Sequence, residues 1–240
     1  DVIESRGLGD VYKRQDVITI TVNDAAEADV TAANLSTLGG KTAGTVTVSN
    51  AVDIAGTAAQ LTAALVTTDT LVVASTATAT ISDAAETDIA ATVLSAIGAK
   101  TSGTVTATNA IDIAGTAAEV TAALVTADTL VVAGSATVTI SDNPSITDLN
   151  AIAAKTSGVV TATLAADSLS NLGALSTAGT DAITITVNDA EGDTVTAANL
   201  SALGGKTAGT VTVSNAVDIT GDHDQVTAAL VTDSTKVVAS

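Results

Sequence analysis

The sequence contains no cysteine, methionine, phenylalanine or tryptophan, and it has one proline and one histidine. Without cysteine, the chain can form neither disulfides nor thiolate metal sites. A single histidine also excludes most Ser-His-Asp arrangements of catalytic residues. No apolar run approaches the roughly 18 residues of a membrane-spanning helix, so we expect no membrane insertion. Because no nucleophile stands beside a base, we expect no enzyme and assign no catalytic residue.

Positive charge is scarce as well. The chain has 8 Lys and Arg residues against 26 Asp and Glu residues, which gives a net charge of −18. The first fifteen residues hold as many acids as bases, so the whole excess lies on residues 16–240. Such a surface repels nucleic acid and attracts cations. We therefore expect no nucleic-acid partner and count cations among the candidate partners.

The first fifteen residues differ from the rest of the chain. They contain both arginines, Arg6 and Arg14, and the single tyrosine, Tyr12. Residues 5–15, SRGLGDVYKRQ, resemble the in-frame translation of a transposase-type sequencing adapter. Segments that do not belong to the fold are set aside before fold reasoning. We therefore expect residues 1–15 to be a non-native segment and residues 16–240 to be one repeat solenoid, a fragment of a longer array.

Long repeats are visible in the letters of the sequence. ITITVND occurs at 18–24 and again at 183–189, and TVTVSNAVDI occurs at 45–54 and at 210–219, so both pairs are offset by 165 residues. Such self-similarity is typical of repeat architectures. A shorter phrase, K-T-[AS]-G, recurs inside this span, beginning at Lys41, Lys100, Lys155 and Lys206.

A finer period lies beneath the long one. Residues 31–49 align without gaps on residues 57–75, at an offset of 26. Apolar residues in each unit first follow helical spacing, as in Leu61 and Leu65, and then alternate with threonine as in a strand. The mean spacing of the predicted strands is about 27 residues, within the range of helix-plus-strand solenoids. We expect strands near 18–22, 45–49, 71–81, 104–108, 130–140, 159–163, 182–187, 210–214 and 236–239.

This pattern predicts an α/β fold, a parallel α/β solenoid with coils of about 27 residues. Strands joined through short helices favour parallel pairing with right-handed crossovers. One wall would then be made of strands and the other of helices. Because the apolar side chains are mainly Ala, Val, Leu and Ile, the core between the walls must be thin. The alternative is a string of tandem β-sandwich domains.

Two sets of aspartates recur at equivalent places, one directly after a strand and one at the end of the phrase N-A-V-D or its variants. Aspartate accepts hydrogen bonds from free N–H groups at turns and helix starts, so we interpret both sets as caps. The alternative is a ladder of carboxylates that binds calcium, the one cofactor we consider, although calcium needs roughly six to eight oxygen ligands. The candidate metal ligands are Asp24, Asp83, Asp142, Asp189, Asp53, Asp112, Asp167 and Asp218.

Thr-x-Thr is the most regular feature of the predicted strands. On parallel strands these pairs would form a flat lattice of roughly 7 by 4.8 Å. That lattice resembles the ice-binding face of some threonine-rich β-solenoids. The simpler interpretation is that threonine has high strand propensity and that a strand face toward water needs polar residues. The pairs are Thr19/Thr21, Thr45/Thr47, Thr78/Thr80, Thr104/Thr106, Thr137/Thr139, Thr161/Thr163, Thr184/Thr186 and Thr210/Thr212.

Two further features have structural interpretations. His223, in GDHDQ, is expected at an exposed helix start rather than in a metal site. The pairs Gly39-Gly40 and Gly204-Gly205 are expected to end helices, because neither belongs to a phosphate-binding loop motif. The lysines of the K-T-[AS]-G phrase then lie near helix C-termini, where a cation is favoured.

Phrases such as TVTVSNAVDIAGTAA and TISDAAET, together with the acidic charge, resemble the Ala/Thr-rich repeat regions of giant secreted surface proteins of aquatic bacteria, including adhesin-like and type I-secreted ones. The resemblance covers residues 16–240. It implies an extracellular or cell-surface stalk or spacer, tuned by calcium, whose partners are neighbouring repeats of the same parent chain. The alternative function is a surface-binding module that uses the Thr-x-Thr face for ice, glycan or mineral.

Overall fold

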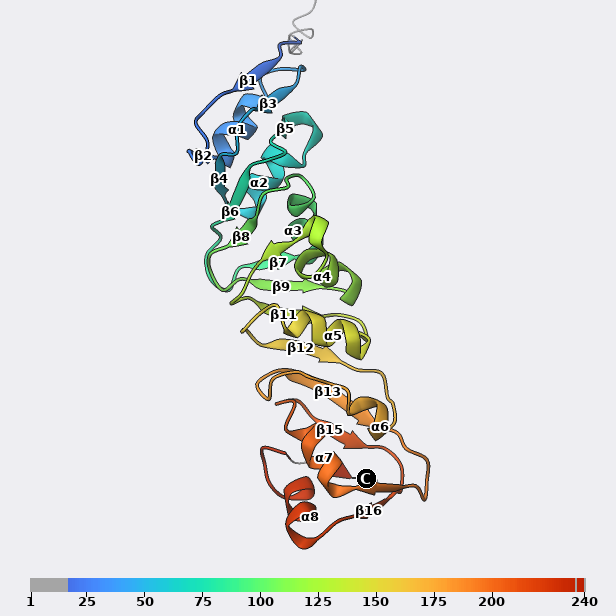
Figure 1. Ribbon diagram of the computed structural model, residues 1–240. Helices are drawn as coiled ribbons and strands as arrows, with labels where there is room; N and C mark the ends of the chain where they lie inside the picture. Colours follow the sequence, from blue (N-terminus) through green and yellow to red (C-terminus); the bar gives the residue numbers. More distant parts are fainter. Residues whose placement is uncertain (1–16, 236, 240) are drawn as a thin grey trace, which may run out of the picture.

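The chain forms an elongated stack of strand–helix coils (Figure 1). The computed structural model describes residues 17–235 and 237–239. Every strand pairing in that part of the chain is parallel. The repeating strand–helix unit is about 27 residues long, so the predicted parallel α/β repeat fold is confirmed. The alternative of tandem β-sandwiches is wrong, because sandwiches are built from antiparallel sheets.

Short helices recur once in each coil. Most begin after a Thr, Ser or Asp whose side chain accepts a hydrogen bond from the helix backbone, and Thr57 and Thr116 form full capping boxes with Gln60 and Glu119. Along the described residues the α-helices are α1 (Ala32–Gly39), α2 (Ala58–Leu65), α3 (Ala91–Gly98), α4 (Ala117–Leu124), α5 (Ile146–Ala153), α6 (Leu169–Leu172), α7 (Ala197–Gly204) and α8 (His223–Leu230), with single 3₁₀ turns η1 (Thr68–Thr70) and η2 (Ala127–Thr129).

The strands are shorter than the sequence pattern suggested, and most coils contain two of them. In the described residues they are β1 (Ile20–Val22), β2 (Asp29–Thr31), β3 (Val46–Val48), β4 (Asp53–Gly56), β5 (Val72–Val73), β6 (Thr78–Ile81), β7 (Asp88–Ala90), β8 (Val105–Ala107), β9 (Asp112–Gly115), β10 (Val131–Val132), β11 (Thr137–Ile140), β12 (Val160–Thr163), β13 (Ala182–Val187), β14 (Thr194–Thr196), β15 (Val211–Val213), β16 (Asp218–Thr220) and β17 (Val238–Ala239).

The strand count of the sequence analysis needs two corrections. The expected strands at 71–81 and 130–140 are each two strands, because a turn closed by a hydrogen bond from Ala77 N–H to Ala74 O divides the first, and Ala136 and Ala133 divide the second in the same way. A second strand in the coil, such as β4, was missed altogether. These strands are three or four residues long and begin with Asp or Thr, so they carry too little alternation to be recognised.

Successive coils do not build one continuous sheet. β4 pairs with β6, and β6 pairs with β8, so one ladder runs in the order β2-β4-β6-β8-β10. The next ladder starts at β7 and continues through β9 and β11. The sheets are therefore staggered along the molecule, and each new sheet begins before the previous one has ended.

The core lies between the strands and the row of helices. It is thin, as predicted, and is filled by Ala, Val, Leu and Ile side chains. Ile54 of β4 and Leu61 of α2 are 0% exposed, as are Leu94 and Ile97 of α3. Each coil buries these side chains against its neighbours, which is why the stability of such a fold depends on contacts between adjacent repeats.

The K-T-[AS]-G phrase joins each coil to the coil before it. The hydroxyl of Thr207, which is 5% exposed, lies 2.8 Å from the carbonyl oxygen of Ile183 and accepts the N–H groups of Ile183 and Gly209, each at 2.8 Å. Thr42 binds Ile18 in the same way, at 2.6 Å from its carbonyl oxygen. The threonine, rather than the lysine, is thus the residue that fixes this loop.

Candidate functional site

Three of the aspartates that follow a strand cap a helix of the preceding coil. Asp83 Oδ2 accepts the N–H of Ala58 at 2.6 Å, and Ala58 is the first residue of α2. Asp142 accepts the N–H of Ala117 of α4 at 2.7 Å, and Asp189 accepts that of Leu169 of α6 at 2.7 Å. The capping interpretation is confirmed for this set, but the capped helix lies 20 to 25 residues earlier in the chain.

The second set of aspartates binds hydroxyl and amide groups. Asp53 opens β4 and accepts the hydroxyl of Thr78 at 3.1 Å from the next strand, and Asp112 accepts that of Thr137 in the equivalent place. Asp167 accepts the N–H of Ser168 at 2.7 Å. For Asp53 and Asp112 the prediction of helix capping was wrong, because each is the first residue of a strand and its carboxylate accepts a threonine hydroxyl of the neighbouring strand.

The two remaining candidates lie in the first and last coils. The carboxylates of Asp24 and Asp218 have no hydrogen-bond donor among the described residues. In the same part of the chain, no three His, Asp or Glu side chains come close enough together to hold a metal ion. Six of the eight aspartates that we considered for calcium therefore make separate polar contacts, and the described residues do not gather the eight into one cluster.

The Thr-x-Thr pairs lie on the outer face of the strands. In β3, Val46 and Val48 are buried and Thr47 between them is partly exposed. The pairs meet across strands in several places, as in Thr21 beside Thr47 and Thr80 beside Thr106. The alternation that the sequence predicted is therefore confirmed for these strands.

The threonines do not form one continuous lattice. Thr47 is followed on the next strand by Val73, and Thr106 by Val132, both more than 40% exposed. Where β4 meets β6, Thr78 lies beside Asp53. The expected flat array is thus divided into patches, because the ladders that end at β5 and β10 each end in a Val-Val strand and the sheets are staggered.

The largest patch of threonines covers four neighbouring strands. Across β11, β12, β13 and β15 the cross-strand neighbours are Thr139 with Thr161, Thr163 with Thr184, and Thr186 with Thr212. On β12, the threonine that pairs with β13 lies two residues after the one that pairs with β11. On β13, the threonine that pairs with β15 again lies two residues after the one that pairs with β12. The patch is consequently a diagonal band rather than a rectangular grid.

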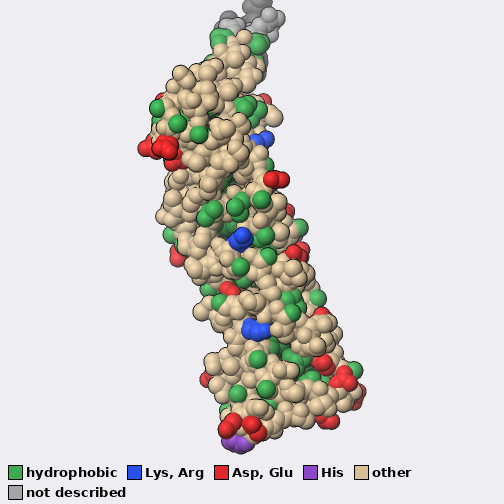
Figure 2. Space-filling view, in the orientation of Figure 1, with side chains coloured by type: hydrophobic (Ala, Val, Ile, Leu, Met, Phe, Trp, Pro, Cys, Tyr) green, Lys and Arg blue, Asp and Glu red, His purple; other side chains and the backbone are tan. Residues whose placement is uncertain are grey.

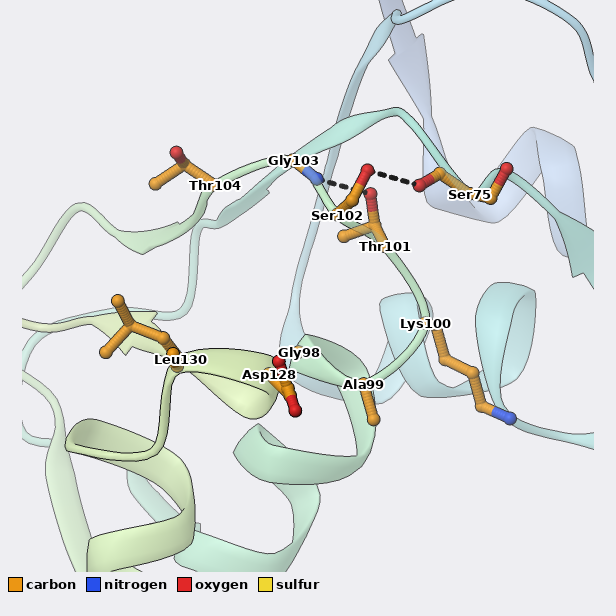
Figure 3. A pocket seen from close by; sticks show the side chains of 11 residues that line it. Ser75, Gly98, Ala99, Lys100, Thr101, Ser102, Gly103, Thr104, Asp128 and Leu130 are labelled. Carbon is orange, nitrogen blue, oxygen red and sulfur yellow. Dashed lines mark hydrogen bonds between the residues drawn. The ribbon is translucent and has the colours of Figure 1, made fainter.

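The phrase that begins at Lys100 lines a hollow of about 480 Å³ against η2 (Figure 3). Ser102 donates a hydrogen bond to Ser75 O at 2.9 Å, and Thr101 accepts the N–H of Gly103 at 3.0 Å. The ammonium group of Lys100 points away from Asp128. Equivalent hollows recur at residues 39–45 and 204–209. The hydroxyl groups of Thr101 and Ser102 in this wall each bond a carbonyl oxygen of the preceding coil.

The repeated lysines lie where the sequence analysis placed them, just after the ends of α1, α3, α5 and α7. Lys206 Nζ donates to the carbonyl oxygen of Gly173 at the end of α6, at 2.8 Å. A cation at a helix C-terminus is stabilised by the helix dipole. Lysine side chains recur along the long axis between surfaces that carry Asp and Glu (Figure 2).

His223 is the first residue of α8 and its side chain is 90% exposed. Its Nδ1 lies 3.2 Å from Asp224 Oδ1, and Asp224 is 98% exposed. The expected exposed helix start is confirmed. The helix itself is capped by Asp222, which accepts the N–H of Gln225 at 2.9 Å.

No protein-family model, curated protein or solved structure matches this chain. Within the residues that the structure describes, no helix combines the length and the apolar character needed to cross a bilayer.

Proposed function

We propose that this chain is a structural repeat segment that serves as a stalk or spacer in a large extracellular surface protein of a bacterium. The observation that carries the proposal is the way in which successive coils are joined. A parallel backbone ladder, a threonine of the K-T-[AS]-G phrase and a capping aspartate each connect one coil to another, and all three connections recur along the stack.

Such joints suit a load-bearing rod. Each coil contacts mainly its neighbours, so the length of the rod grows with the number of repeats while its cross-section stays constant. The surface supports this role as well. A net charge of −18 on a protein of 23.1 kDa keeps neighbouring rods apart and hydrated.

The spacer function predicts that reach follows repeat number. One copy or two tandem copies of the full chain are placed between a cell-surface anchor and a fluorescent tag, and the distance from tag to membrane is measured by energy transfer to a membrane dye. We expect the second copy to raise the tag by the same increment as the first. A Gly/Ser linker of equal length is the control, since its reach grows only with the square root of its length. Equal tag heights for one and two copies contradict the proposal.

A second candidate function is binding to an ordered surface through the diagonal band of threonines on β11, β12, β13 and β15. The observation that favours it is the repeated pairing of exposed or partly exposed threonines across four neighbouring strands. The test measures adsorption of the full chain to ice, chitin and hydroxyapatite. Thr163→Lys with Thr184→Lys places two charges in the centre of the band and would abolish binding. The control, Thr92→Lys with Thr147→Lys, places them on exposed helix positions and would leave binding unchanged.

A further inference from the structure

The first and last described coils carry the two halves of an interface that recurs between them. We propose that copies of this chain associate head to tail, with β1 of one copy added as a parallel strand to the free edge of β16 of the next copy. The partner is thus a second copy of this chain, and the proposal does not depend on where the protein acts.

The interior version of this interface is the pairing of β4 with β6. Ile54 lies opposite Ala79 and Ala55 opposite Thr80, and the pairing of β9 with β11 has the same register. The added strand, β6 or β11, is followed two residues later by Asp83 or Asp142, which cap the helix after β4 or β9. One strand therefore closes both a sheet edge and a helix start.

The C-terminal end presents the first half of this interface. β16 stands 165 residues after β4 and shares with it the phrase NAVDI. Within the described residues β16 pairs with β14 alone, whereas β4 pairs on both sides. No described strand occupies the outer edge of β16, at the place where β4 receives β6.

The N-terminal end presents the second half. Residues 19–24, TITVND, match residues 78–83, TATISD, in pattern, so β1 is the counterpart of β6. Within the described residues β1 pairs with β3 alone. Aligning Asp24 with Asp83 places Ile20 opposite Ile219 and Thr21 opposite Thr220 of a second copy.

Apolar side chains at both ends are more exposed than their interior counterparts. Ile54 and Leu65 are 0% and 1% exposed, whereas Ile219 and Leu230 are only partly buried and Val231 is 66% exposed. At the other end Ile20 is partly buried, while Ala79, at the equivalent place in β6, is 1% exposed. Contact between the two ends would remove this surface from water, which favours association.

The polar groups at the two ends are complementary too. Inside the stack, Thr78 donates to Asp53 and Asp83 accepts from the first N–H of α2. In the first and last coils, no described residue donates a hydrogen bond to the carboxylate of Asp24 or Asp218. The backbone N–H of His223 likewise has no acceptor among the described residues. In the proposed contact Thr19 would donate to Asp218, and Asp24 would cap α8 at His223.

One residue of the junction departs from the interior sequence. His223 stands where α2 has Ala58, which is 4% exposed. The imidazole lies against Asp224, and the interior residue at that position, Ala59, is exposed. The ring, which is 90% exposed, therefore lies toward the solvent side of the helix.

A contact of this kind joins two different surfaces and does not close on itself. Head-to-tail contacts generate open filaments unless the rotation between copies closes a ring. In any longer array the same edge of β16 is filled by the coil that follows, which is the same interface made within one chain.

The experiment measures the mass of the full chain by light scattering and sedimentation between about 1 μM and about 1 mM, the range of moderate to weak affinities. We expect the mean mass to rise above the monomer value of 23.1 kDa with concentration. Thr21→Pro and Ile219→Pro each block one end. Ile20 N–H and Asp218 N–H point inward, to Thr45 O and Asp193 O, so by alternation the N–H groups of residues 21 and 219 face the open edges.

Each proline variant is expected to remain monomeric, because proline removes an edge N–H without disturbing an internal bond. The controls Thr21→Val and Ile219→Val keep the N–H and are expected to associate. A mixture of the two proline variants still has one intact head and one intact tail, so it should form a complex of twice the monomer mass and nothing larger.

The mixture also shows that the variants are folded, since two unfolded chains cannot complement each other. Helicity and melting midpoints of the separate variants provide a second check. A wild-type chain that stays at 23.1 kDa over the whole range overturns the proposal. So does assembly of either proline variant alone, or a mixture of two folded variants that remains monomeric.

Discussion

At the scale of single residues, a few side chains join coils that lie far apart in the sequence. Asp83 reaches the first N–H of α2 across 25 residues, and Thr42 reaches Ile18 across 24. Each bond satisfies backbone groups that a short helix or strand end leaves unpaired. The contribution of these residues can therefore be measured by replacing them one at a time.

The substitution Asp83→Ala is expected to lower the free energy of unfolding by about 1 kcal/mol, because a helix N-cap residue typically contributes between about 0.5 and 2 kcal/mol. Chemical denaturation of the full chain measures the change. Asp69→Ala is the matched control, since Asp69 is exposed and no side-chain bond caps η1. Equal midpoints for the two variants would show that the cap across coils does not stabilise the fold.

A second change tests how closely the coils approach each other. A Cβ at Gly103 would overlap the carbonyl oxygen of Ala77 in the preceding coil, whereas a Cβ at Gly134 has no heavy atom within 4 Å. Gly103→Ala is therefore expected to cost about 1 to 3 kcal/mol, as overpacked sites do, while Gly134→Ala stays within about 0.5 kcal/mol. Thermal melts of both variants measure the difference in stability. A Gly103→Ala protein as stable as Gly134→Ala would show that the loop can move away from Ala77.

At the scale of helices and strands, the sequence predicted the repeat, the parallel pairing and the outward threonines, because these depend on periodicity alone. It did not predict β4 or its counterparts, which are too short to show a period. The sequence also could not predict the hydrogen-bond partners of Asp83 and Thr42. A capping residue normally lies beside its helix in sequence, and only the stacking of coils places Asp83 above α2.

The same helix position is expected to contribute more to the free energy of unfolding in the interior of the stack than in its last described coil. Leu65 of α2 is 1% exposed, and its counterpart 165 residues later, Leu230 of α8, is only partly buried. Leu65→Ala is expected to cost about 2 to 5 kcal/mol and Leu230→Ala distinctly less, because the cost of truncation follows the burial of the side chain. Denaturant titration of the two variants under monomeric conditions compares them. Equal losses of unfolding free energy in the two variants would argue against stabilisation by neighbouring coils.

At the scale of the whole molecule, the stack is a linear series of similar units in which each interface is used once. Stability is then a sum over units and nearest-neighbour contacts, and the outermost units hold fewer contacts than the inner ones. The identical phrases at 45–54 and 210–219 make this measurable, since their different surroundings are the only difference between them.

Amide hydrogen exchange of the monomer is expected to be faster at Ile219 than at Ile54. Both residues stand in the same ten-residue phrase and have the same chemical exchange rate, but β4 pairs on both sides and β16 pairs with β14 alone among the described strands. The N–H of Ile219 faces the edge of β16 that no described strand covers, so it has no ladder bond to break before it exchanges, whereas the corresponding N–H of Ile54 faces β6. Raising the protein concentration should slow exchange at Ile219 and leave Ile54 unchanged, because a second copy would then cover the edge of β16. Protection at Ile219 that equals that of Ile54 in the monomer would mean that the edge of β16 is already covered.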